Sequence, residues 1–178
     1  KAINLGIDLE DERKYKFVKD TDFRFLNGTL YMDGIDVSHD IRENDVSNNV
    51  SLVSSFLSVR KELVLAQQVL ADNHNVVMDG RDIGTVVFPD AELKIFMTAS
   101  VEVRTQRRFS ELVAKGDDVT LEEISANLKH RDAVDSSREN SPLTMTSDYR
   151  ILDNSEMDRD SQFALAMAWA DEVFSLIS

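Results

Sequence analysis

The alternation of apolar and polar residues predicts a small antiparallel sheet near the start of the chain. Residues 23–37 alternate around Asn27-Gly28 and Asp33-Gly34, the dipeptides most typical of tight hairpin turns. Two or three short strands are therefore expected here, as an insertion into a larger fold. Before them, residues 1–8 look like the last turn of a helix, and the acidic run at residues 8–12 is typical of a helix start.

Farther along the chain the apolar spacing becomes helical and then strand-like. Helical spacing over residues 45–71, interrupted near residues 56–58, predicts two helices. Short apolar runs at residues 75–78 and 93–98 are typical of strands buried on both faces of a parallel sheet. The remaining predicted elements are helices over residues 101–115, 121–135 and 158–177 and a strand over residues 149–152. This alternation predicts a layered α/β fold, in which ligands bind beyond the carboxyl ends of the strands.

Length and composition describe one ordinary domain without membrane or disulfide features. The chain has 178 residues, of which 42% are hydrophobic and 30% are charged. No apolar run approaches the roughly 20 residues of a membrane span, and no secretory pattern is seen. Because the sequence has no cysteine, disulfides, thiolate catalysis and zinc–thiolate sites are excluded. A cytoplasmic location is expected, with a monomer as the simplest assembly.

The acidic charge balance excludes one class of partner. The formal net charge is −13, whereas a protein that binds extended nucleic acid needs a basic stripe to displace counterions. A small anionic ligand remains compatible, because the local field in a cleft governs its binding. The arginines of this chain gather at three motifs along the sequence.

The first motif is an Arg-Asp pair that follows the apolar run at residues 75–78. Arg81 and Asp82 lie between Gly80 and Gly84, which permit close approach of a ligand or a positive φ. A binding role for the pair and a structural salt bridge that caps a strand are equally consistent with these residues alone.

The second motif places three guanidinium groups on one face of a predicted helix. Arg104, Arg107 and Arg108 are spaced i, i+3 and i+4, so their charges repel one another unless an anion lies nearby. An exposed face that Glu102 and Glu111 balance is the alternative interpretation.

The third motif is a stripe of Arg131, Asp135 and Arg138 on the next helix, which Ser141-Pro142-Leu143 ends. Two arginines can hold phosphate oxygens while the carboxylate orients one of them or accepts from a sugar hydroxyl. A helical ion-pair ladder is the alternative. No metal site is predicted, because metal-ligand spacing is missing among the histidines, which are His39, His74 and His130.

Together these motifs resemble bacterial cytidylate kinase, a P-loop nucleoside monophosphate kinase. The resemblance rests on Asp79-Gly-Arg-Asp-Ile-Gly-Thr-Val-Val-Phe-Pro-Asp-Ala, the Arg-x-x-Arg-Arg helix, Arg131-Asp-x-x-Asp-x-x-Arg138, Ser-Pro-Leu and Leu152-Asp153. Upstream matches are Asp36-Val37, Ile41-Arg42, Val46-Ser47-Asn48 and Val59-Arg60. The order of the motifs is unbroken from about Gly6 to the end of the sequence.

The resemblance implies a three-layer P-loop kinase core with a parallel sheet, a small antiparallel insertion that forms the monophosphate-binding domain, and a helical lid. It divides the chain into a helical remnant at residues 1–14, a monophosphate-binding region at residues 15–72 and a kinase core at residues 73–178, with the lid at about residues 100–140. The implied reaction transfers the γ-phosphoryl group of ATP, with Mg²⁺, to CMP or dCMP.

The resemblance also assigns roles to matching positions. Ser51, Arg60 and Asp82 read cytosine, whose amine donates to a carboxylate while its ring nitrogen and carbonyl accept from a guanidinium. The other assigned residues serve the acceptor phosphate (Arg81, Arg138), the ribose end (Arg131, Asp135) and the ATP side (Arg104, Arg108). The expected catalytic residues, which neutralise developing charge, are Arg81, Arg131 and Arg138.

One part of the family pattern is missing from this sequence. Such kinases begin with a strand and a G-x-x-x-x-G-K-[ST] loop that holds the ATP phosphates and Mg²⁺, and none of the six glycines here precedes Lys-Ser or Lys-Thr. With the first strand and P-loop absent, this chain by itself is expected to be inactive. Two alternatives stay open: a non-catalytic nucleotide-binding fragment, or another small-molecule kinase of this fold, such as one that acts on adenylate or shikimate.

Overall fold

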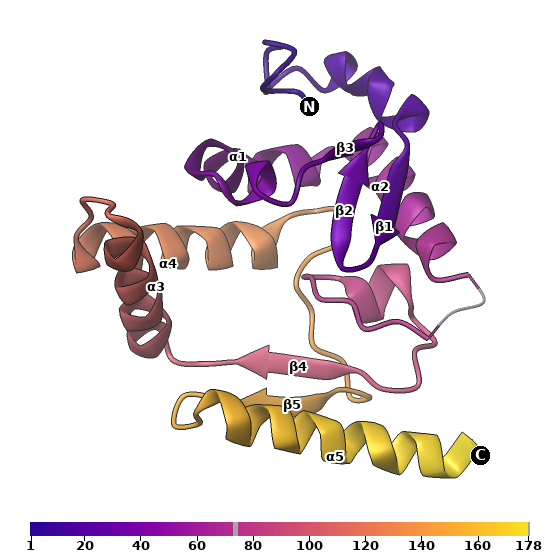
Figure 1. Cartoon of the computed structure of the whole chain (residues 1–178), viewed down its shortest axis with the longest axis vertical. Helices are drawn as coiled ribbons and strands as arrows, with labels where there is room; N and C mark the ends of the chain where they lie inside the picture. The colour runs from indigo at the N-terminus through magenta and orange to yellow at the C-terminus, as the bar shows by residue number, and fades with distance from the viewer. Residues whose placement is uncertain (73–74, 178) are drawn as a thin grey trace. The chain divides into compact units, whose positions relative to one another are not determined.

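The computed structural model describes residues 1–72 and 75–177, and His74 therefore lies outside the described residues. The chain separates into two compact units, one of Lys1–Pro89 with Ser137–Leu143 and one of Asp90–Ser136 with Thr144–Ser178. The first unit contains an antiparallel sheet and the second a parallel one (Figure 1). The chain therefore has the mixed α/β character that its periodicity predicts.

The antiparallel sheet of the first unit forms around the predicted turns. β1 (Phe23–Leu26), β2 (Thr29–Met32) and β3 (Ile35–Asp36) pair in that order. Asn27 and Gly28 have φ values of 51° and 81°, and Asp33 and Gly34 have values of 53° and 80°. Both turns thus use the left-handed region at two successive residues, as tight two-residue hairpins require.

The helices of the first unit follow the predicted break. α1 (Asn44–Ser55) and α2 (Leu57–Leu70) are separated by Phe56, whose backbone is extended at φ −69° and ψ 123°. Two 3₁₀ segments, η1 (Glu12–Asp20) and η2 (Asp40–Arg42), precede them. The helix expected at the acidic run is η1, which begins at Glu12 and has the tighter 3₁₀ form.

The core of the first unit lies between η1 and α2. Tyr15 and Val18 of η1 pack in one cluster with Val59 of α2, and all three side chains are buried. The ring of Phe56 lies 5.4 Å from that of Tyr15, measured between centroids. The Tyr15 hydroxyl donates to the Leu9 carbonyl at 3.0 Å, so the polar end of this buried ring is paired. This packing fixes α2, the helix that carries Arg60.

The strand predicted over residues 75–78 is not formed. These residues are irregular chain, and Val77 is fully exposed. A parallel strand is stable only beside a hydrogen-bonding neighbour, and no strand of the described chain pairs with this segment. Residues 75–78 have the apolar pattern of a strand, but a strand here would need a neighbouring strand to pair with, which the local sequence does not provide.

The second unit is built on a two-stranded parallel sheet. β4 (Ile95–Thr98) pairs with β5 (Arg150–Asp153), and Leu152 of β5 is 1% exposed. Parallel neighbours need a long connection, and here it contains α3 (Val101–Lys115) and α4 (Leu121–Ser137). These elements agree with the predicted ones to within two residues at each end.

Two features complete the second unit. α3 ends at Gly116, whose φ of 88° is the left-handed conformation that favours glycine after a helix. α5 (Arg159–Ile177) runs beside β5 (Figure 1). The two are linked through Arg150 of β5, which lies 2.5 Å from Glu172 and over the ring of Trp169. Among the helices described, none combines the length and the apolar character needed to cross a membrane.

Candidate functional site

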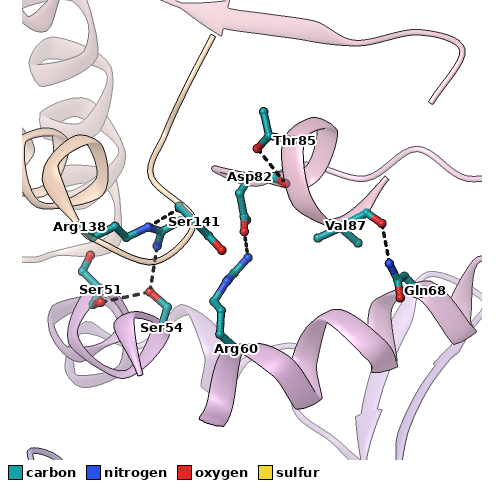
Figure 2. A network of polar contacts seen from close by, with 9 residues as sticks. All are labelled: Ser51, Ser54, Arg60, Gln68, Asp82, Thr85, Val87, Arg138 and Ser141. Atoms are coloured by element: carbon teal, nitrogen blue, oxygen red, sulfur yellow. Dashed lines mark hydrogen bonds and ion pairs between the residues drawn. The ribbon is translucent and has the colours of Figure 1, made fainter. Parts of the chain in front are cut away.

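Arg60 and Asp82 form a buried ion pair in the first unit. Arg60 projects from the first turn of α2, and its guanidinium donates to the Asp82 carboxylate (Figure 2). The two side chains are 13% and 3% exposed. The Nε atom of Arg60 is buried without a hydrogen-bond partner in the described chain, and a buried donor of this kind is costly unless a ligand pairs with it.

The loop after Asp82 is held by hydrogen bonds at both ends. The Asp82 carbonyl accepts from the backbone N–H groups of Thr85, Val86 and Val87, at 3.3, 2.8 and 3.3 Å. This arrangement gives a short π-helical segment, η3 (Ile83–Val87), which the sequence pattern did not predict. Gln68 of α2 donates to the Val87 carbonyl at 2.9 Å, so α2 fixes both sides of the loop (Figure 2).

The two glycines of this loop do not adopt left-handed backbone. Neither Gly80 nor Gly84 has a positive φ, so of the two predicted reasons for these glycines the positive φ is wrong, and close approach of a ligand stays a prediction. A Cβ atom added at Gly80 would lie 2.8 Å from Cγ1 of Ile83. Glycine is needed at this position because the Ile83 side chain occupies the space. Arg81, between the two glycines, is exposed.

Arg138 belongs to the first unit and makes hydrogen bonds with polar groups of the same unit. Its Nε donates to the Ser141 carbonyl at 2.6 Å, and its Nη1 lies 3.5 Å from the Ser54 hydroxyl (Figure 2). The Ser54 hydroxyl in turn donates to the Ser51 carbonyl at 3.1 Å. Two residues with predicted roles, Ser51 and Arg138, are thus connected through Ser54, which no sequence motif had indicated.

The predicted helical stripe is wrong for Arg138. α4 ends at Ser137, so Arg138 follows the helix, whereas Arg131 and Asp135 lie on it. The backbone turns at Ser141, with a φ of 51°, and Pro142 then prevents helical continuation. The carbonyl that this turn exposes accepts the Arg138 Nε proton, which stabilises the non-helical path.

In the second unit, Arg131 and Asp135 remain one helical turn apart on α4. Asp135 is 4% exposed, and a carboxylate this deeply buried requires polar partners. The Nε atom of Arg131 is buried and has no hydrogen-bond partner among the residues described. Both features are compatible with the predicted role of these side chains at a ribose.

The arginines of α3 have protein partners within the second unit. Arg104 makes two contacts with the Asp132 carboxylate, at 2.8 and 3.1 Å, and Arg108 lies 2.8 Å from Glu111. The alternative interpretation, in which glutamates on α3 balance these arginines, is therefore confirmed for Arg108 and Glu111. Arg108 and Lys115 both lower the pKa of Glu111 below its usual value, with Lys115 as the larger cause.

Arg107 has a different role from its two neighbours. Its guanidinium donates to the side-chain oxygen and the backbone carbonyl of Asn154, each at 2.8 Å, and to the Met157 carbonyl at 3.2 Å. Three contacts from one guanidinium tie α3 to the loop after β5. Arg107 is therefore a structural residue of the second unit.

The histidines within the described chain are exposed. His130 lies at the surface of α4, and His39 lies 4.0 Å from both the Asp40 and the Glu43 carboxylate. The potential metal-ligand atoms of His39, Asp40 and Glu43 lie within 4.8 Å of one another, but all three side chains are exposed. Sequence spacing had not indicated this group, and nothing else around it points to a metal.

Comparisons with known proteins agree with the motifs. The family model described as cytidylate kinase matches residues 1–168. A cytidylate kinase from Flavobacterium johnsoniae is 46% identical over 163 residues, which are 92% of this chain and 69% of that protein. Cytidylate kinases from Parabacteroides distasonis and Pediococcus pentosaceus are 46% and 45% identical, over 89% and 88% of this chain and 72% of each relative.

Proposed function

The chain belongs to the cytidylate kinase family, and from this premise we propose that it serves the transfer of the γ-phosphoryl group of ATP to CMP or dCMP. The products are ADP and CDP or dCDP. The Arg60–Asp82 pair is the observation that supports this substrate best. It presents a guanidinium beside a carboxylate in a buried setting, which is the complement of the Watson–Crick edge of cytosine.

The base would be read by the first unit. The exocyclic amine of cytosine donates to the Asp82 carboxylate, and the unpartnered Nε of Arg60 supplies a donor for the ring nitrogen or carbonyl. Ser51, on the neighbouring helix α1, adds a hydroxyl. Uracil has a carbonyl in place of the amine, so it would set two acceptors against each other at Asp82.

The remaining assigned residues would serve the phosphate and the sugar. Arg138 and Arg81 hold the acceptor phosphate, while Arg131 and Asp135 contact the ribose end. A phosphate oxygen of CMP attacks the γ-phosphorus as the bond from that phosphorus to the bridging oxygen of ADP breaks. Charge grows on the transferring oxygens, and the proposed role of Arg81, Arg131 and Arg138 is to neutralise it.

Fewer residues of this sequence are assigned to ATP than to the acceptor nucleotide. Arg104 and Arg108 are proposed for it, and each would exchange its present carboxylate partner for phosphate oxygens. Mg²⁺ accompanies ATP in such reactions, but the residues here do not form a suitable site. The one group of close metal-ligand atoms in the described chain, around His39, contains none of the proposed substrate residues. The proposal therefore includes no Mg²⁺ ligand from these residues.

The sequence contains no G-x-x-x-x-G-K-[ST] loop, so we propose that the 178-residue chain binds CMP without turning it over. A coupled assay of ADP release on this chain tests that point. Sustained, CMP-dependent ADP release would refute it and would leave the assignment of the substrate intact.

Thermal shift tests the substrate assignment. CMP should raise the Tm of the chain more than equal concentrations of UMP or AMP, because a ligand at 100 times its Kd adds about 2.7 kcal/mol to the folded state. Equal shifts with AMP would favour a different kinase of this fold.

The Asp82→Asn variant tests whether the preference for CMP over UMP comes from Asp82. Its amide can donate to a uracil carbonyl, so the preference for CMP over UMP should fall by about tenfold or more, as measured by calorimetry. Asp72→Asn, an exposed carboxylate beyond the end of α2, is the control and should keep the preference. An unchanged preference in Asp82→Asn would show that Asp82 does not read the base.

A further inference from the structure

We propose that Ser54 is a positioning residue that sets the guanidinium of Arg138 for the acceptor phosphate, an inference that rests on the function proposed above. Ser54 lies one helical turn after Ser51 on α1, and its hydroxyl is the group between the Ser51 carbonyl and the Arg138 guanidinium (Figure 2). Neither the spacing of motifs nor the charge pattern singles this serine out.

The direction of the hydrogen bonds supports this role. A serine hydroxyl has one proton to donate and two lone pairs to accept with. Its proton goes to the Ser51 carbonyl at 3.1 Å, three residues back on the same helix. The lone pairs therefore face away from α1, and Nη1 of Arg138 lies 3.5 Å from the oxygen. Since the hydroxyl rotor is fixed by the helix, Ser54 can serve Arg138 only as an acceptor.

A second acceptor fixes the plane of the same guanidinium. The Ser141 carbonyl accepts from Nε of Arg138 at 2.6 Å, and the positive φ of Ser141 sets the direction of the local backbone. Contacts at Nε and Nη1 together restrict rotation about the last bonds of this long side chain. A guanidinium held in this way meets a phosphate with less loss of conformational entropy than a mobile one.

The neighbouring residue provides a matched control. The Ser55 hydroxyl donates to the Leu52 carbonyl at 2.7 Å, which is the same three-residue back-bond on the same helix. The Ser54 hydroxyl, in addition to its back-bond, lies 3.5 Å from Nη1 of Arg138. Replacement of either serine by alanine removes one such back-bond, so the difference between the two variants isolates the contact with Arg138.

The experiment compares CMP with cytidine, which lacks the phosphate, by calorimetry on the 178-residue chain. Ser54→Ala should weaken CMP binding about five- to tenfold, the effect of one hydrogen bond, and should leave cytidine binding unchanged. Ser55→Ala should change neither. Ser54→Thr should retain the wild-type ratio of the two affinities, whereas Ser54→Val, which has nearly the same shape but no hydroxyl, should behave like Ser54→Ala.

Two results would overturn the inference, and they are distinguishable. If the wild-type chain binds CMP in preference to UMP but Ser54→Ala keeps the wild-type ratio of CMP to cytidine affinity, the proposed function stands and Ser54 has no positioning role. If the wild-type chain shows no preference for CMP, both proposals fail together. The Thr and Val variants decide the question in the same way should Ser54→Ala prove poorly folded.

Discussion

Asp148 shows how one exposed carboxylate can make stability depend on pH. Lys94 donates to it at 2.5 Å, and Thr146 donates to its other oxygen; these contacts, with Lys94 the larger cause, lower the pKa of Asp148 to about 2. The pKa is depressed in the folded state, so the contribution is present above the ordinary carboxyl pKa. It is lost as the pH falls through the folded value.

This shift predicts a pH-dependent difference between the wild-type chain and Asp148→Asn. The wild type should have the higher Tm at about pH 5, and the difference should shrink as the pH falls to about 2.5, because the carboxylate becomes protonated. Thermal unfolding of both proteins across this range measures it. A difference that stays constant with pH would mean that the ion pair with Lys94 contributes no linkage.

At the scale of single residues, the sequence located charged groups better than their partners. From the residues alone, Arg81-Asp82 was open to interpretation as a structural salt bridge. The ion pair in the structure joins Asp82 to Arg60, 22 positions earlier on α2, which only the resemblance had assigned to the same base. Partner choice depends on how α2 packs, which no short motif records. Ser54 was missed for the same reason, since its importance comes from the position of Arg138, 84 residues away.

At the scale of elements, the loop before η3 depends on the absence of a side chain at Gly80. An alanine there would place Cβ 2.8 Å from Cγ1 and 3.0 Å from Cδ1 of Ile83, both closer than ordinary contacts. We expect Gly80→Ala to lower the free energy of unfolding by about 1–3 kcal/mol through overpacking.

A double-mutant cycle with Ile83→Ala checks this cause. Removal of the Ile83 side chain removes both close contacts, so Gly80→Ala should cost about 1 kcal/mol less in the Ile83→Ala background. Denaturant unfolding of the four proteins gives the coupling. Strict additivity would indicate that the glycine is required for another reason.

Elements whose stability is local were predicted, whereas residues 75–78 and η3, which depend on other contacts, were not predicted correctly. β4 and β5 were predicted although they pair across a long connection. The hairpins at Asn27-Gly28 and Asp33-Gly34 and the end of α3 at Gly116 depend on backbone preferences that the sequence states directly. Residues 75–78 have the apolar pattern of a strand but no ladder partner in the described chain. η3 depends on three N–H groups that converge on one carbonyl, and no periodicity signals such a turn.

At the scale of the whole molecule, the excess of acidic residues opposes compaction. The chain has 33 acidic and 20 basic residues, so its folded state concentrates a net charge of −13. Self-repulsion of this kind is screened by salt, since the Debye length falls from about 30 Å at 0.01 M to about 10 Å at 0.1 M.

We therefore expect the Tm at neutral pH to rise as NaCl is increased from about 0.01 M to about 0.1 M. The control is the same titration near the isoelectric point of about 4.6, where the net charge vanishes and the rise should largely disappear. Thermal unfolding measures both. A Tm that falls with salt at neutral pH would indicate that ion pairs such as Lys94–Asp148 outweigh the general repulsion.

The family and the chemistry of the acceptor were predictable at this scale, because several motifs in fixed order identify both. The assignment of residues 1–14, 15–72 and 73–178 to separate regions stays a prediction. Composition carries no information about which side chains share a surface, so the membership of the candidate site rests on the individual contacts within each unit.

The Arg60–Asp82 pair is assembled by folding itself, which has a kinetic consequence. α2 and η3 hold both groups in place, but Asp82 is 3% exposed and Nε of Arg60 is buried, so the site must open before a base reaches them, and this step is the same for every base. Cytosine and uracil should then associate at similar speeds. Discrimination between them should appear almost wholly in residence time, with the mismatched base leaving sooner.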